Sequence, residues 1–239
     1  MTLCNKEVAQ TARAPVLGTT LLARVHELNR NYVDLLATQA DVRSIDAQGL
    51  PHKVLDALAQ LSESARSRLA ASPFALYTLG FEDQQFWRTV LGENGVADRD
   101  DSLPDYFNAL NASPAVAFCE VALFFVWHTA VVNRVAARVM FGLPEMLSER
   151  IAQTPLWRLR KIAAEFPGLL LPRWPANPGF WPDLVRFAAA SDWGRLQTAQ
   201  LLGNQLTAVD LDAAFDEGRM PGSRGRRVDI TRARGKAGR

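Results

Sequence analysis

Three histidines and several acidic pairs are the side chains of this 239-residue chain that could transfer a proton. His26, His52 and His128 each stand alone, without the cysteine or serine motif that a nucleophile and its base require. His128 lies in an apolar run, so we interpret it as a satisfied core histidine; an enzyme would instead need a pocket around it and Glu120. The acidic pairs are interpreted as solvated helix ends: Glu82/Asp83, Glu145/Glu149 and Asp210/Asp212. Since no metal-ligand spacing or nucleotide-binding loop occurs, the sequence predicts a non-enzymatic protein without a metal or cofactor.

Basic side chains that could bind a partner fall into two groups. One is an Arg-rich C-terminal segment, which carries Arg224, Arg226, Arg227, Arg232, Arg234 and Lys236. Such a polycation binds phosphates in a salt-dependent, sequence-insensitive way, docks on an acidic partner or on the acidic body of the chain, or only keeps the protein soluble. The other group alternates aromatic and basic residues and suits a protein or DNA surface, with a solvated helix face as the alternative: Trp157, Arg158, Arg160, Arg173 and Trp174.

The charge is divided between a basic end and an acidic body. From Arg219 onward the chain has eight Lys/Arg and one acid, whereas the preceding 218 residues have 19 bases and 24 acids, a net charge of −5. The cysteines Cys4 and Cys119 match no metal or redox spacing, which is typical of a reduced cytosolic protein with one buried thiol. No signal peptide is evident, and the apolar run from Val121 to Val132 is shorter than the roughly 20 residues that cross a bilayer. We therefore expect a cytoplasmic protein without membrane insertion, in which this run forms a buried helix.

Hydrophobic periodicity predicts helices along almost the whole chain. Apolar residues recur at three- and four-residue steps from Leu21 to Leu36, as in a helix entered through Thr19 or Thr20. Short helices are expected after Pro51 and after Ser62, and the alternating segment 74–81 indicates an extended piece. The acidic, Gly95-containing stretch 93–102 is the natural linker. Further helices are expected at 114–141, 144–153, 155–165, 180–190 and 192–211.

The chain also repeats itself at an offset of 93 residues. Gly49-Leu50-Pro51 aligns with Gly142-Leu143-Pro144, and this alignment gives seven identities in 23 ungapped positions. One added residue later, Phe86-Trp87 aligns with Phe180-Trp181, which predicts core positions for both tryptophans. A period this long indicates a duplicated domain rather than a solenoid.

The repeated unit resembles the FlhD family of flagellar transcriptional activators. The family's long helix carries a motif like E-L-N-x-x-Y-L-x-L-L, and this chain has Glu27-Leu28-Asn29 followed by Tyr32 and Leu35-Leu36. Downstream, Arg134-Val135-Ala136-Ala137 and Lys161-Ile162-Ala163 match further family segments.

The resemblance implies an all-α fold of two tandem FlhD-like units, residues 15–95 and 104–215, packed as a pseudo-dimer. The Arg-rich tail that follows, 216–239, has almost no large apolar residue, so its composition predicts disorder. It also implies a transcription regulator that acts through assembly with an FlhC-like protein partner, with DNA contact through that partner or the tail. The alternative is a cytosolic structural adaptor of a flagellar or type III secretion apparatus. Either function depends on protein–protein interaction rather than on catalysis.

Overall fold

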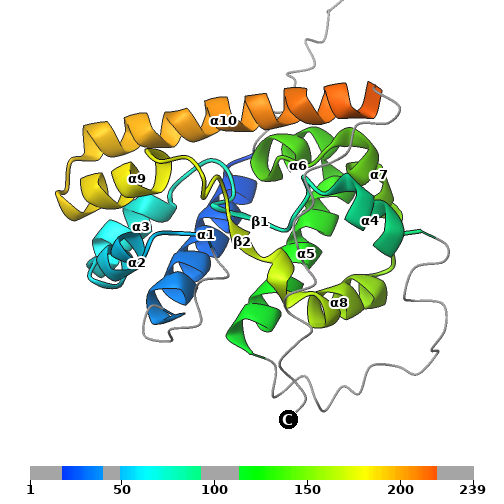
Figure 1. The fold of residues 1–239 in the computed structure, drawn as a ribbon, viewed down its shortest axis with the longest axis horizontal. Helices are drawn as coiled ribbons and strands as arrows, with labels where there is room; N and C mark the ends of the chain where they lie inside the picture. The colour runs from blue at the N-terminus through cyan, green and yellow to red at the C-terminus, as the bar shows by residue number, and fades with distance from the viewer. Residues whose placement is uncertain (1–17, 40–48, 93–112, 220–239) are drawn as a thin grey trace, which may run out of the picture.

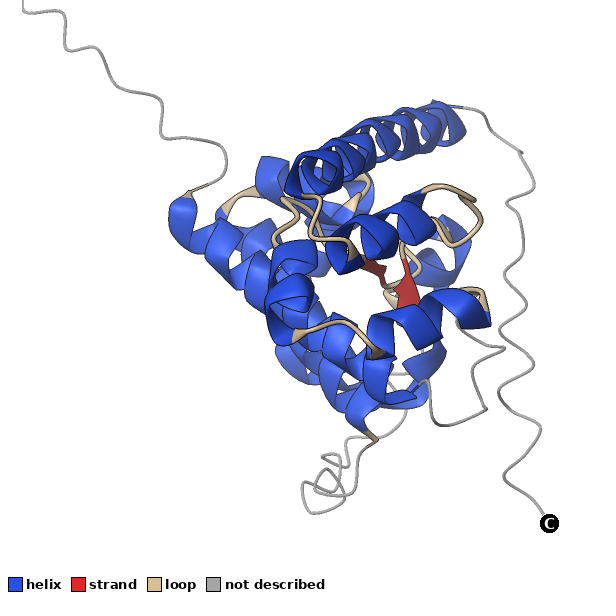
Figure 2. Ribbon diagram, turned by 90° about the vertical axis from the view of Figure 1, so that its left-hand side faces the viewer, coloured by secondary structure: helices blue, strands red, loops and turns tan. Residues whose placement is uncertain are grey.

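A computed structural model describes residues 18–39, 49–92 and 113–219, and this part of the chain is mostly helical, as the periodicity predicts (Figures 1 and 2). The first half contains α1 (Thr19–Gln39), α2 (His52–Ala59), α3 (Glu63–Ala70), β1 (Tyr77–Thr78) and α4 (Gln84–Val90). The second half contains α5 (Pro114–Val132), α6 (Arg134–Phe141), α7 (Glu145–Gln153), α8 (Leu156–Glu165), η4 (Pro167–Leu169), β2 (Leu171–Pro172), α9 (Phe180–Ala189) and α10 (Trp193–Arg219).

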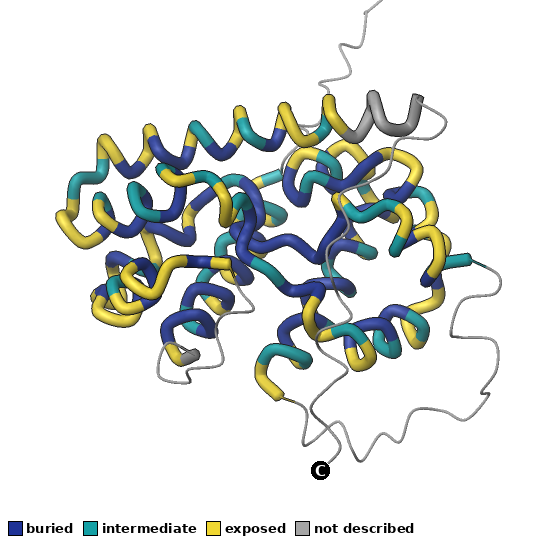
Figure 3. Tube along the Cα trace, in the orientation of Figure 1, coloured by how far each residue is buried: buried dark blue, intermediate teal, exposed yellow. Residues whose placement is uncertain are grey.

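The two short strands join the halves at the centre of the molecule (Figure 2). β1 and β2 are antiparallel, with Tyr77 opposite Pro172 and Thr78 opposite Leu171. The predicted extended segment 74–81 is confirmed around β1, but every residue in it is buried, without the alternation in exposure expected of a half-buried strand. Helices cover both of its sides, so this segment forms the centre of one continuous hydrophobic core (Figure 3).

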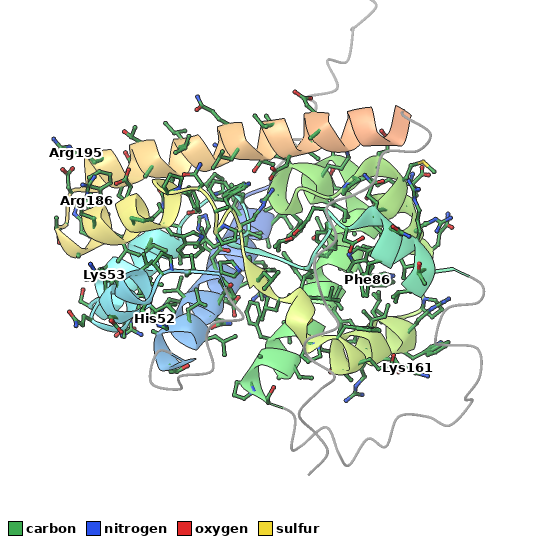
Figure 4. All side chains as sticks on the ribbon, viewed as in Figure 1. His52, Lys53, Phe86, Lys161, Arg186 and Arg195 are labelled. Atoms are coloured by element: carbon green, nitrogen blue, oxygen red, sulfur yellow. The ribbon has the colours of Figure 1, made fainter. Side chains whose placement is uncertain are left out.

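Helices that follow the strands pack against the opposite half. α9 lies against α2 and α3 of the first half, and α4 lies against α7 of the second (Figure 1). The ring of Phe86 on α4 meets Phe166 edge-to-face at 5.1 Å, at the position labelled in Figure 4. α10 runs along one side of the molecule and contacts both α9 and α6. The halves therefore share their core instead of forming two separate ones.

Residues of the repeat adopt matching conformations in the two halves. Gly49 and Gly142 have positive φ angles of 73° and 67°, a region that glycine enters without steric cost. The prolines of the same motifs, Pro51 and Pro144, immediately precede α2 and α7 with φ angles of −59°. Trp87 and Trp181 are fully buried, which confirms the predicted core positions.

The long helix predicted at 114–141 is wrong, because it divides at Asn133. This residue is extended, with φ −151° and ψ 90°, and its side-chain oxygen accepts a hydrogen bond of 3.0 Å from the Ala136 amide. An asparagine in this conformation caps a new helix, so α6 starts in a new direction. Further along the chain, α10 continues beyond the predicted limit of 211 to Arg219. The prediction that the disordered tail begins at 216 is therefore wrong for residues 216–219, which are helical.

The apolar helix α5 is less buried than the sequence predicts. Several of its valines are exposed, among them Val132, which is 70% exposed, and His128 is exposed as well. The expectation of a core histidine at position 128 is therefore wrong, because that face of α5 is not covered by a described element. Among the described residues, α5 alone has the length and composition of a membrane span, a test that core helices of soluble proteins also pass; here α5 packs against α6, α7 and α8.

Candidate functional site

Arg173 and Trp174 follow β2 directly and lie at a cavity between the two halves. The backbone amide of Arg173 donates to the Leu76 carbonyl at 3.0 Å, and this bond extends the pairing of the central strands. Trp174 has a positive φ of 51°, which is uncommon for a residue with a side chain. This conformation sends its indole toward α10, where Nε1 donates to Asp210 Oδ2 at 2.7 Å.

The guanidinium of Arg173 is enclosed, with only 3% of the residue exposed. Its Nη1 donates to the Met140 carbonyl at 3.2 Å, in the last turn of α6, where a positive charge is favourable. The guanidinium also lies over the ring of Trp174, 4.4 Å from the centroid. A flat protein or DNA surface cannot reach this guanidinium. Arg173 therefore does not belong to an exposed basic surface with Arg158 and Arg160, as the sequence suggests.

The second nitrogen of this guanidinium, Nη2, has no hydrogen-bond partner among the described residues. The nearest carboxylate is that of Asp210, with Oδ2 3.7 Å away. Burial lowers the pKa of Arg173 to about 10, and the carboxylates of Asp210 and Glu82 act in the opposite direction. At neutral pH the site therefore contains one charged guanidinium and two carboxylates that stabilise it.

The cavity beside Arg173 has a volume of about 310 Å³ and combines apolar walls with an acidic edge. Phe81, Phe141 and several prolines supply the walls, and Glu82 and Asp210 are its acidic residues. Both are exposed, and Glu82 accepts a hydrogen bond from the Thr78 hydroxyl at 3.1 Å. From the sequence, both acids are interpreted as members of solvated pairs. They line one cavity because α10 and the turn after β1 meet there, and no local spacing predicts that meeting.

Three further predicted binding residues, Trp157, Arg158 and Arg160, lie on α8 (Figure 1). None of them lines the cavity beside Arg173. Arg158 Nη2 donates to the carbonyls of Val90 and Gly92, at 3.0 and 2.6 Å, and so holds the end of α4. Arg160 pairs with Glu120 of α5, with Nε 3.2 Å from Oε1. Of the three, Trp157 is the one with a largely exposed side chain, at 46%. Most of this predicted surface therefore stabilises contacts between helices.

The remaining sequence predictions concern other regions. The basic residues Arg224 to Lys236 lie outside the described residues, as do the predicted linker 93–102 and Cys4. Cys119 is buried, as expected of one of the two thiols. Neither His128 nor Glu120 lines the cavity beside Arg173.

An apolar surface that sequence reasoning missed lies on the second half. The large hydrophobic side chains that are exposed in the described part of the chain all fall between positions 121 and 209: Val121, Val131, Val132, Val135, Val139, Met146, Leu156, Trp157, Leu201 and Val209. Four of them belong to the last turn of α5 and to α6, the helix that follows it, and we call Val131, Val132, Val135 and Val139 the valine surface. The four-residue spacing of Val135 and Val139 is a helical-face signal that the sequence does contain.

Comparison of the chain with protein-family models, with curated proteins and with solved structures found no match.

Proposed function

We propose that this protein is a non-enzymatic regulator built from two FlhD-like helical units in tandem, which acts by assembling with a protein partner. The register of the central strands supports the tandem arrangement. Adding 94 to the positions of Tyr77 and Thr78 gives Leu171 and Pro172, and each strand residue pairs with the counterpart of the other. An antiparallel pair related in this way is what a two-fold axis between duplicated units produces.

The reciprocal packing of α4 and α9 is further support for a pseudo-dimer. Each helix follows its strand and rests on short helices of the opposite half. The buried tryptophans make similar bonds, from Trp87 Nε1 to the Gly80 carbonyl at 3.0 Å and from Trp181 Nε1 to the Arg173 carbonyl at 2.6 Å. Exchange of this kind is expected when two subunits of a dimer become joined in one chain.

The observation that carries the partner-binding function is that the exposed large apolar residues of the described chain all belong to its second half. The four members of the valine surface are 39% to 70% exposed, and the described first half has no large hydrophobic side chain of comparable exposure. Contiguous apolar patches on a soluble protein are typical of interfaces. The partner that fits this surface presents an apolar helix face, and the family resemblance proposes an FlhC-like regulator.

Replacing Val135 and Val139 together by glutamate tests this proposal, because it places charge on the interface without touching the core. We expect the complex with a purified FlhC-type protein, measured by sedimentation velocity and calorimetry, to weaken at least tenfold. Leu201→Glu, at an exposed apolar position on α10, is the matched control and should leave the affinity unchanged. No complex with the wild-type chain, or equal affinity in the doubly substituted variant, would contradict the proposal.

DNA contact is the second part of the proposed function, and the basic segment 220–239 supports it through its charge. Serine at Arg224, Arg226 and Arg227 should reduce the slope of log affinity against log salt by about three, since each phosphate contact contributes roughly 0.9. Fluorescence anisotropy with a labelled DNA duplex at several salt concentrations measures this slope. The DNA part fails if the wild-type chain shows no binding or a slope equal to that of the variant.

A further inference from the structure

The cavity beside Arg173 has the chemistry of a receptor for an arginine side chain. Its acidic edge is formed by Glu82, from the turn after β1, and by Asp210 of α10. Its walls are apolar and aromatic and include Phe81 and Phe141. An arginine needs this combination, because its methylene stem packs on apolar surface while its planar head pairs with carboxylates.

Arg173 leaves the acidic edge under-neutralised. Its Nη1 is used by the Met140 carbonyl, and its Nη2 stops 3.7 Å from Asp210, beyond hydrogen-bond distance. Glu82 accepts a hydrogen bond from the Thr78 hydroxyl, which is a neutral donor. Two exposed carboxylates therefore face one guanidinium that is committed to the end of α6, and the site has an excess of negative charge.

We propose that this cavity binds an arginine of the chain's own C-terminal segment, residues 220–239. Asp210 and Ala213 line the cavity from α10, which ends at Arg219. The nine helical steps from Asp210 to Arg219 span about 14 Å. Five extended residues cover up to about 17 Å, so Arg224 and the basic residues after it can reach back to the cavity.

Charge complementarity favours this occupant over others. The segment from Arg219 onward carries eight Lys/Arg against one acid, and the rest of the chain has a net charge of −5. Covalent attachment next to the cavity gives the segment a high effective concentration there, which a separate peptide lacks. An arginine held in this way is withdrawn from phosphate groups, so the contact would restrain nucleic-acid binding, a regulatory role that goes beyond the proposed function.

A binding experiment in which the peptide and the cavity are varied separately tests the proposal. The probe is a fluorescein-labelled peptide of residues 220–239, added to the full chain with serine at its own Arg224, Arg226, Arg227, Arg232, Arg234 and Lys236. We expect Glu82→Gln to weaken peptide binding at least tenfold at low salt, because glutamine keeps an acceptor for Thr78 but removes the charge. Asp210→Asn, which keeps an acceptor for Trp174, should act in the same direction.

Asp56→Asn is the matched control, since Asp56 is an exposed acid on α2, away from the cavity lining. It should change the affinity less than twofold, and a peptide with citrulline in place of arginine should bind at least tenfold more weakly.

The wild-type chain should bind the probe more weakly than the serine variant because its own segment competes. Equal losses for Glu82→Gln and Asp56→Asn would show nonspecific attraction to an acidic body and overturn the proposal, as would absence of binding. None of these variants alters the valine surface, so failure here is distinguishable from failure of partner assembly.

Discussion

Gly49 and Gly142 occupy equivalent positions of the repeat but have different surroundings. Both have positive φ, so in each case a side chain adds backbone strain. A Cβ at position 49 would lie 3.2 Å from the Cβ of Pro175, a contact that a small shift relieves. A Cβ at position 142 would collide with the guanidinium of Arg173, which is held by the Met140 carbonyl and by the ring of Trp174. A side chain is therefore harder to accommodate at position 142 than at position 49.

Gly142→Ala should consequently destabilise the protein more than Gly49→Ala. The left-handed backbone accounts for about 1–2 kcal/mol in both variants, and displacement of Arg173 adds to the loss in one of them. Urea unfolding followed by circular dichroism measures the two free energies of unfolding, and each variant serves as the control for the other. Equal losses would mean that Arg173 moves without cost.

Asn29 shows how far residue-level prediction can go. The family motif includes it, but nothing local predicts its bonds. Its Nδ2 donates to the carbonyls of Ala70 and Phe74, at 3.2 and 2.8 Å, and its Oδ1 accepts from the Leu76 amide at 2.9 Å. These partners lie more than 40 positions away, so only the folded chain identifies Asn29 as the residue that ties α1 to the central extended segment.

Secondary-structure elements are predicted correctly where apolar periodicity is strong. A helix boundary is not predicted where a side chain redirects the backbone, as at Asn133. α2, α3, α7, α8 and α9 lie within a few residues of their predicted ranges. The break at Asn133 was missed because the apolar residues continue across it. Hydrophobic pattern identifies which residues seek the core, whereas a helix end depends on which backbone groups a capping side chain satisfies.

Arg158 is predicted as a binding residue, but its contacts connect two helices of the fold. Because its guanidinium donates to the carbonyl of Val90, the last residue of α4, and to that of Gly92 just after it, Arg158→Ala should loosen that helix and cost about 1–3 kcal/mol. Hydrogen exchange should then be faster for the amides of α4, residues 84–90, than in the wild type. Lys161→Ala on the same helix is the control, and unchanged exchange in α4 after loss of Arg158 would refute the structural role.

In the molecule as a whole, α4 and α9 each pack against helices of the opposite half, which should make unfolding cooperative. The buried side chains form one hydrophobic cluster that includes residues of both halves. α10 also connects the two halves. Its Gln200 Nε2 donates to the Arg68 carbonyl of α3 at 3.0 Å, and its Asp210 accepts a hydrogen bond from Trp174 Nε1. Neither half closes its core alone.

The protein should therefore unfold in one transition, although its sequence suggests two units. Urea curves recorded by circular dichroism and by tryptophan fluorescence should coincide, which is the test for a two-state process. A fragment of residues 15–95 should lack stable helix, because α2 and α3 would lose α9. Two separate transitions, or a fragment with native-like helical content, would contradict a shared core.

Local periodicity and side-chain hydrophobicity are sufficient to predict the mostly helical class, the positions of most helices and the burial of the repeated tryptophans. The tertiary structure decided that Arg173 is enclosed, that Arg158 holds a helix end, and that Glu82 and Asp210 converge on one cavity. It also decided that the apolar surface lies on α5 and α6. These features depend on which distant segments meet, and that follows from the packing of the whole core and not from any window of residues.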